Sequence, residues 1–129
     1  MPKPKQPRPT DAELQILRVL WQRGASTVRE VYETLNETKP TGYTTVLKFM
    51  QIMAEKGLVR RDEEQRAHVY TTRVPQEQTQ QQMVRDLLRR VFNDSPAQLM
   101  MQALATKRAS PEELAEIRRL LDEFERGGK

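Results

Sequence analysis

A mainly helical fold with one small β-hairpin is predicted by three features of this sequence. Apolar residues recur at the spacing of a helix face in six separate segments. Three of these segments start with a capping box, in which a Thr or Ser and a Glu three residues later can exchange hydrogen bonds. Two short strand-like runs, residues 58–62 and 67–72, follow the third segment. We therefore expect three helices, a hairpin wing and three further helices.

The first two helices are predicted by how they start and by which residues repeat. Their capping boxes are Thr10 with Glu13 and Thr27 with Glu30. In the first helix the residues expected to point inward are Leu14, Leu17, Leu20 and Trp21. In the second helix they are Val28, Val31, Tyr32 and Leu35. Pro40 cannot continue the second helix, so residues 36–41 are expected to be a connection.

The third helix, expected over residues 42–56, separates an apolar face from a polar one. Its inward residues are Val46, Phe49, Met50 and Met53, and its outward residues are Thr44, Thr45, Lys48, Gln51 and Glu55. Gly57 can adopt the left-handed conformation that ends such a helix. Hydroxyls, an amide and a lysine on an outer face suit reading of the DNA major groove, whereas the segment taken alone also fits a solvated amphipathic helix.

Three short helices within about fifty residues predict a helix-turn-helix core, and the hairpin that follows them is a candidate wing. The loop of this hairpin is acidic, since Glu63 and Glu64 precede Gln65 and Arg66. The two glutamates would repel phosphate, so we expect Arg66 to make any contact between the wing and DNA. Further charge nearby is expected from Lys56, Arg60 and Arg61.

Pro75 is expected to separate a winged helix-turn-helix domain, residues 10–75, from a helical dimerisation domain, residues 76–129. Residues 1–9, with four prolines and three cations, are expected to form a disordered basic arm. Because three short helices bury little surface alone, we expect the second domain to complete its core in a homodimer, the alternative being that it folds back on the first. The expected dimerisation residues are Met83, Leu87, Leu88, Leu114, Ile117, Leu121 and Phe124. A capping box at Ser110 and Glu113 starts the last helix.

Composition narrows the classes of function. The net charge of +4 lies in residues 1–75, where 13 Lys and Arg face 9 Asp and Glu, while residues 76–129 hold 9 of each; this favours a polyanion partner for the first domain. The absence of cysteine excludes disulfides and thiolate metal sites. His68 is the single histidine, and no motif supplies a nucleophile or a phosphate loop, so we expect no enzyme, no cofactor and no metal site. With no apolar run long enough for a membrane span and no secretory signal, we expect a cytoplasmic protein without membrane insertion.

Five short motifs stand in a fixed order along the chain. They are Thr10-Asp11-Ala12-Glu13-Leu14 with Leu20-Trp21, Thr27-Val28-Arg29-Glu30-Val31, Tyr43-Thr44-Thr45-Val46, Glu55-Lys56-Gly57-Leu58-Val59 and Arg66-Ala67-His68-Val69-Tyr70. In this order and spacing they resemble the penicillinase-repressor family of BlaI and MecI type, which has copper-responsive CopY-like relatives. The resemblance covers residues 10–126 and implies a homodimeric transcriptional repressor that binds an inverted-repeat operator. The alternative is a helical protein-interaction module without sequence-specific DNA binding.

The resemblance also implies which residues meet the double-stranded operator: Tyr43, Thr44, Thr45 and Lys48 on the third helix, and Arg66 on the wing. It further implies a membrane-bound sensor protease as a partner; where the best-known members are cut between an asparagine and a phenylalanine, this chain has Gln102-Ala103. Ile52 stands where a basic residue is common, and Gln65 where a glycine precedes the wing arginine. The sequence leaves open the operator, the regulated genes and the inducing signal, but it lacks the cysteines through which the relatives sense copper.

Overall fold

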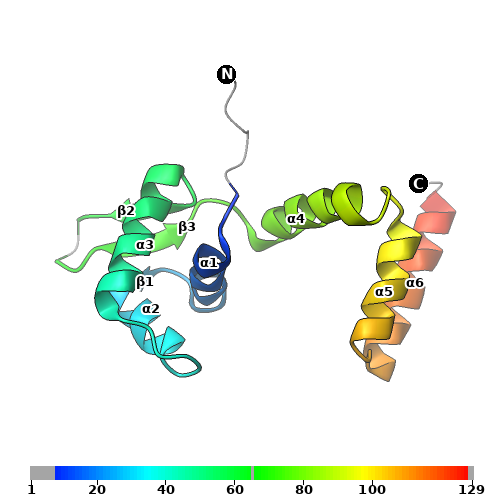
Figure 1. The fold of residues 1–129 in the computed structure, drawn as a ribbon, viewed down its shortest axis with the longest axis horizontal. Coiled ribbons are helices and arrows are strands. Elements are labelled where there is room, and N and C mark those ends of the chain that lie inside the picture. The colour runs from blue at the N-terminus through cyan, green and yellow to red at the C-terminus, as the bar shows by residue number, and fades with distance from the viewer. Residues whose placement is uncertain (1–7, 65, 128–129) are drawn as a thin grey trace, which may run out of the picture. The chain divides into compact units, whose positions relative to one another are not determined.

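The computed structural model describes residues 8–64 and 66–127 (Figure 1). Its elements in chain order are α1 (Asp11–Arg23), β1 (Ser26–Thr27), α2 (Val28–Leu35), α3 (Tyr43–Lys56), β2 (Val59–Asp62), β3 (Val69–Thr72), α4 (Gln76–Val91), α5 (Pro96–Thr106) and α6 (Pro111–Gly127). The chain divides into two compact units, Met1–Gln81 and Gln82–Lys129, and the boundary along the sequence falls within α4. Most of the arm predicted over residues 1–9 lies outside the described residues.

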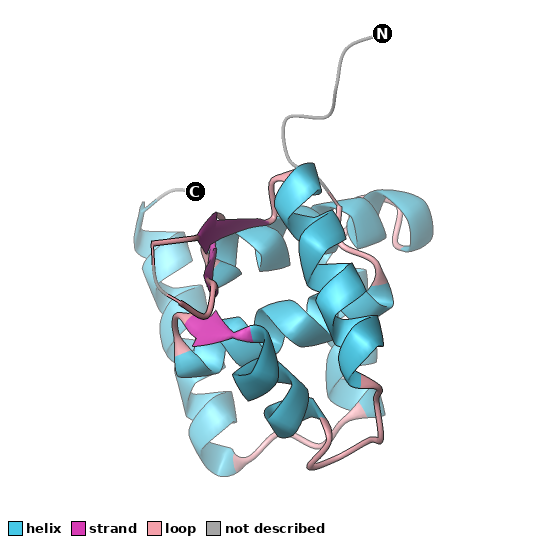
Figure 2. Cartoon of the chain, turned by 90° about the vertical axis from the view of Figure 1, so that its left-hand side faces the viewer, coloured by secondary structure: helices cyan, strands magenta, loops and turns pink. Residues whose placement is uncertain are grey.

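Helices make up most of the described chain, and the strands form one small sheet (Figure 2), which confirms the predicted fold class. The capping boxes are confirmed as well. In the first box the Glu13 amide donates to Thr10 Oγ1 at 3.2 Å, and the Thr10 amide donates to Glu13 Oε1 at 2.9 Å. The same exchange occurs at the starts of α2 and α6. Each box satisfies backbone donors that the first helical turn leaves without partners.

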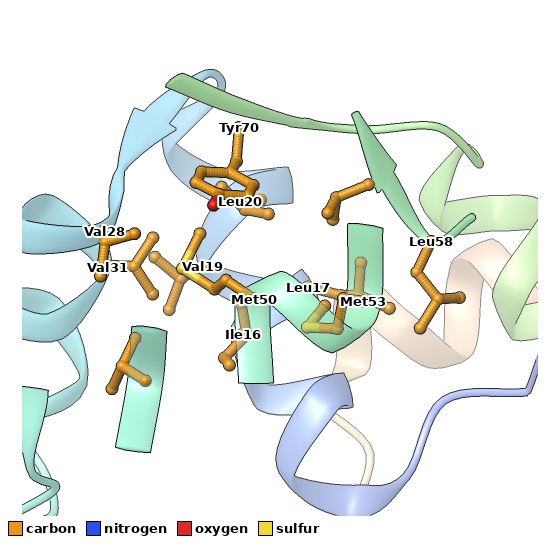
Figure 3. Close-up of a cluster of buried hydrophobic side chains, with 12 residues drawn as sticks. Ile16, Leu17, Val19, Leu20, Val28, Val31, Met50, Met53, Leu58 and Tyr70 are labelled. Carbon is orange, nitrogen blue, oxygen red and sulfur yellow. The ribbon is translucent and has the colours of Figure 1, made fainter. Parts of the chain in front are cut away.

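The core of the first unit lies between α1, α2, α3 and the sheet (Figure 3). Its buried hydrophobic residues are Ile16, Leu17, Val19, Leu20, Val28, Val31, Val46, Met50, Met53, Leu58, Val59 and Tyr70. Five of the residues predicted to point inward are only partly buried and pack against the edge of this core: Leu14, Trp21, Tyr32, Leu35 and Phe49. On α1, Ile16 and Val19 lie inside the core although the predicted stripe leaves them out. The buried stripe of α1 is centred on Ile16 and Leu20, and Leu14 and Trp21 lie at its edge, because α1 packs against α2, α3 and β3 together.

The sheet has the strand order β1-β3-β2, and both pairs are antiparallel. The hairpin of β2 and β3, with its connecting loop, is called the wing below. Its strands are shorter than the sequence predicts, and His68 lies exposed just before β3. Strand β1 was not predicted, because it has two residues and exists only through pairing of Ser26 with Tyr70 and Thr27 with Val69. This pairing fixes the start of α2 beside the wing.

Residues 82–127 contain no buried hydrophobic side chain. The helix start of α5 is capped by Ser95, whose Oγ accepts a hydrogen bond from the Gln98 amide at 3.2 Å. On α6, Arg119 bridges Glu116 and Glu123, and the hydrogen bond from Arg119 lowers the pKa of the Glu116 carboxyl. Helix α6 therefore has a charged face opposite a row of apolar residues. None of the described helices is both long enough and apolar enough to cross a membrane.

Candidate nucleic-acid interface

Helix α3 presents a polar face to solvent, and the core holds this helix from the other side. Of its inward residues, Val46, Met50 and Met53 are fully buried and Phe49 is half-buried. The outward residues are all exposed: Tyr43, Thr44, Thr45, Lys48, Gln51 and Glu55. Within the described residues Lys48 takes part in no ion pair or side-chain hydrogen bond, so its ammonium group is available to a partner. Helix α3 ends at Gly57, whose φ of 86° is left-handed, as predicted.

Asn36 holds the connection that leads into α3. Its Nδ2 donates to the backbone carbonyl oxygens of Tyr32 at 2.8 Å and Thr41 at 2.9 Å, while its Oδ1 accepts from the Thr41 amide at 3.1 Å. One side chain thus ties the last turn of α2 to the residues just before α3 and fixes the angle between the two helices. Helical periodicity does not identify Asn36, and the sequence signal that points to it is an asparagine at a helix end ahead of Pro40.

Tyr43, the first residue of α3, is held by two neighbours on α2. Its ring meets the ring of Tyr32 edge to face, with centroids 5.5 Å apart and planes at 76°. The guanidinium carbon of Arg29 lies 5.2 Å from the centroid of the Tyr43 ring. Contacts of these two kinds contribute about 0.5–1 kcal/mol each at exposed sites. The start of α3 therefore carries an ordered aromatic ring and an attached cation.

The arginines of the wing differ in whether they already form an ion pair. Arg61 Nη2 lies 2.6 Å from Glu63 Oε2. The pKa of the Arg61 guanidinium is raised, mainly by hydrogen bonding with Tyr70 and to a smaller extent by hydrogen bonding with Glu63. Arg60 and Arg66 are exposed and make no ion pair within the described residues. Of the wing cations, these two are the ones available to an external partner.

Lys56 does not belong to this surface, and the expectation that it supplies charge there is wrong. Its Nζ lies 2.7 Å from Oε1 of Glu13, which is only 3% exposed, and it also donates to the backbone carbonyl oxygen of Arg8 at 3.2 Å. The same Glu13 carboxylate accepts the Thr10 amide of the capping box. Lys56 thus fastens the end of α3 to the start of α1, because a buried carboxylate needs a cationic partner.

A hollow of about 600 Å³ opens between the start of α2, the start of α3 and the wing. It brings together two of the predicted site residues, Tyr43 and Arg66. It adds polar residues that the sequence does not single out as site residues, among them Arg29, Glu30, Glu33, Gln51 and His68. Thr44, Thr45 and Lys48 do not line it and stand on the open face of α3. Beside the polar face of α3 the first unit therefore has a hollow in which arginines stand next to Glu30 and Glu33.

The residues predicted for dimerisation all lie on α4 and α6 in the second unit. Exposed there are Met83, Leu87, Leu121 and Phe124, and half-buried are Leu88, Leu114 and Ile117. No cluster of His, Asp or Glu suited to a metal ion occurs in the part of the chain that the structure describes.

A helix-turn-helix core whose third helix has a polar outer face, followed by a two-stranded wing, defines a winged helix-turn-helix protein. The sequence pattern of the penicillinase repressor family matches residues 9–123, and the chain belongs to this family. It is 25% identical to the penicillinase repressor of Bacillus licheniformis over 119 residues, which are 92% of this chain and 93% of that protein. It is 31% identical to the transcriptional regulator BlaI of Mycobacterium tuberculosis over 118 residues, 91% of this chain and 85% of that one.

A solved structure gives the same result for the fold. The solution structure of the DNA-binding domain of the repressor BlaI superposes with a TM-score of 0.51 and 27% identity, over 57% of this chain and 90% of that domain. The family resemblance and the winged-helix fold drawn from the sequence are therefore confirmed.

Proposed function

We propose that this protein is a transcriptional repressor that binds an inverted-repeat DNA operator as a homodimer. The observation that carries the proposal is the face of α3, where exposed hydroxyls and the unpaired Lys48 stand opposite fully buried Val46, Met50 and Met53. A helix held in this way can enter the major groove without disturbing the core. The similarity to a repressor's DNA-binding domain supports the same role.

In this proposal Thr44, Thr45 and Lys48 meet base edges or the adjacent phosphates, with Tyr43 beside them and Arg66 reaching the backbone from the wing. A lysine can donate to guanine O6 and N7, and threonine hydroxyls can bond to either kind of base edge. Two copies of α3 on a twofold axis would meet half-sites about one helical turn apart. The dimer would form through α4 and α6, whose apolar residues are left exposed or half-buried.

The alternative, a protein-interaction module, would need an apolar outer face on α3. Ile52 is the apolar residue that leans toward that face, and it is half-buried beside exposed polar neighbours. The structure thus offers a partner protein little apolar surface on α3, and we retain the DNA-binding role. Operator binding would place the protein in the cytoplasm, where the DNA is.

A membrane-bound sensor protease is a candidate partner through the family. Gln102 and Ala103 are exposed but lie inside helix α5. A protease that needs an extended substrate backbone could cut this bond only after α5 opens locally. Any inactivation by proteolysis would therefore depend on the stability of α5.

The proposed function is tested by sequencing the fragments of its own genome that the protein retains and then titrating the recovered operator at several salt concentrations. If each dimer neutralises about six phosphates, log K should fall with log salt at a slope of about −5. We expect the operator to bind at least about a thousandfold more tightly than a random duplex at the same salt. Equal affinity for both duplexes, or an affinity indifferent to salt, would contradict the proposal.

A further inference from the structure

The hollow between α2, α3 and the wing gathers more cationic groups than the face of α3 does. Its cations are Arg29, at the second position of α2, and Arg61 and Arg66 on the wing, while Tyr43 lines it from the start of α3. The register of β1 against β3 brings them together, since Thr27 pairs with Val69 and the residues beyond this pair continue along opposite sides of the hollow. Residues far apart in the sequence thus line one open site, in which three arginines stand beside Glu30 and Glu33.

We propose that this hollow seats a phosphate of the DNA backbone and that Arg29 is its principal ligand. The inference rests on the proposed function, because it assumes that the face of α3 enters the groove. A duplex strand that passes from α3 toward the wing must cross the space between them, and this is where the hollow lies. A guanidinium is suited to the task, since its planar fork of donors matches two phosphate oxygens.

Arg29 has no strong ion pair that would compete with a phosphate. Its guanidinium carbon lies 5.2 Å from the centroid of the Tyr43 ring, a cation–π contact, and within the described residues its N–H groups donate no hydrogen bond. Its ion pair with Glu33 is long, at 4.0 Å, and both side chains are more than 60% exposed, at 66% and 63%. An exposed pair of this kind is weak and is readily exchanged for a phosphate. Arg66 makes no competing ion pair within the described residues.

Because the hollow also contains acidic residues, the proposal predicts that charge removal raises DNA affinity at one position and lowers it at another. The Glu30 carboxylate accepts the Thr27 amide at 2.9 Å and lies 3.5 Å from Arg23, so it is occupied by the start of α2 and a cation. Glu33 is the carboxylate that faces Arg29 and opposes a phosphate there. Removing the charge of Arg29 should therefore weaken binding, and removing the charge of Glu33 should strengthen it.

The experiment measures the affinity of the full chain for a duplex of random sequence and for the recovered operator, each across a series of salt concentrations. Arg29→Gln should weaken binding to both duplexes by a similar factor of about ten, because a phosphate contact carries no sequence information. The salt slope should become shallower by about one per protomer. Glu33→Gln should raise the affinity for both duplexes several-fold. Arg29→Lys, which retains the charge without the fork, should recover part of the loss.

Arg18→Gln is the matched control, since Arg18 is an exposed arginine of α1 that lines a different hollow. It removes the same charge and should change neither the affinity nor the slope beyond the small effect of net charge. The inference is overturned if Arg29→Gln behaves like Arg18→Gln, if its loss is confined to the operator with an unchanged slope, or if Glu33→Gln weakens binding. If the wild-type protein shows no operator preference, the proposed function fails instead. Circular dichroism of each variant shows whether the fold is retained.

Discussion

The two units of this chain differ in whether their hydrophobic side chains are buried or exposed. Within residues 8–81 twelve hydrophobic side chains are buried, and the one large hydrophobic residue left exposed is Tyr43. Within residues 82–127 none is buried, and ten large hydrophobic side chains are exposed between Met83 and Phe124. The first unit closes a core from its own residues, whereas the second carries amphipathic helices without one.

The difference indicates what each unit needs in order to be stable. Three helices and a sheet enclose the first core from several directions, so its stability does not require a partner. The helices of the second unit each bury too little apolar surface on their own. Exposed apolar surface of this extent is a feature of interaction sites, which supports the proposed dimer. Stability of the second unit should then depend on protein concentration and that of the first should not.

The largest effect is expected from a charge placed in the apolar row of α6. Leu121 is 56% exposed in the single chain. If it is buried in a dimer, Leu121→Asp should weaken dimerisation by about 4 kcal/mol or more, because a carboxylate loses its hydration without gaining a cation. If it stays exposed, the change should be within about 0.5 kcal/mol. Sedimentation equilibrium distinguishes the two.

Ala115→Asp is the control for this measurement, because Ala115 is exposed on the same helix and away from the apolar row. It should leave the dimer intact. A Leu121→Asp protein that remains a dimer would remove this row from the interface. A monomeric one with full operator affinity would refute the link between dimerisation and DNA binding.

A second pair of variants compares one methionine from each unit. Met50 is 0% exposed in the first core, so Met50→Ala should lower the free energy of unfolding by about 3 kcal/mol at every protein concentration. Met101 is 62% exposed on α5, so Met101→Ala should change it by less than about 0.5 kcal/mol. Denaturant titrations at two protein concentrations measure both. A large effect of Met101→Ala that vanishes on dilution would place Met101 in the interface.

A third prediction, with a smaller effect than those of Leu121→Asp and Met50→Ala, concerns the face of α3. Lys48→Ala removes no core atom, so the melting temperature should be unchanged while operator affinity falls by about 1–3 kcal/mol. Preference at one base pair per half-site should relax, which separates base reading from the uniform loss expected for Arg29. Titration against operators varied one base pair at a time is the measurement. Unchanged affinity in a folded variant would show that this face does not meet DNA.

The candidate site could be predicted from the sequence where it depends on one helix. Periodicity alone places Thr44, Thr45 and Lys48 outside and Met50 and Met53 inside, and the structure has them so. Arg29 could not be found in this way, because its place in the site depends on the pairing of β1 with β3. Lys56 was assigned wrongly for a related reason: on its helix it lies at an exposed end, and the buried Glu13 that binds it belongs to another helix.

Local chemistry in the sequence by itself determined the helix starts at Thr10, Thr27 and Ser110, the helix end at Gly57 and the polar face of α3. Each of these depends on hydrogen bonds or side-chain directions within a few residues, so a short stretch of chain is sufficient to specify it. Only the tertiary structure decided the two-residue strand β1, the ion pair of Lys56 with Glu13 and the hollow that joins Arg29 to the wing. These arise from contacts between segments distant in sequence, whose approach is set by the packing of the whole core rather than by any local pattern.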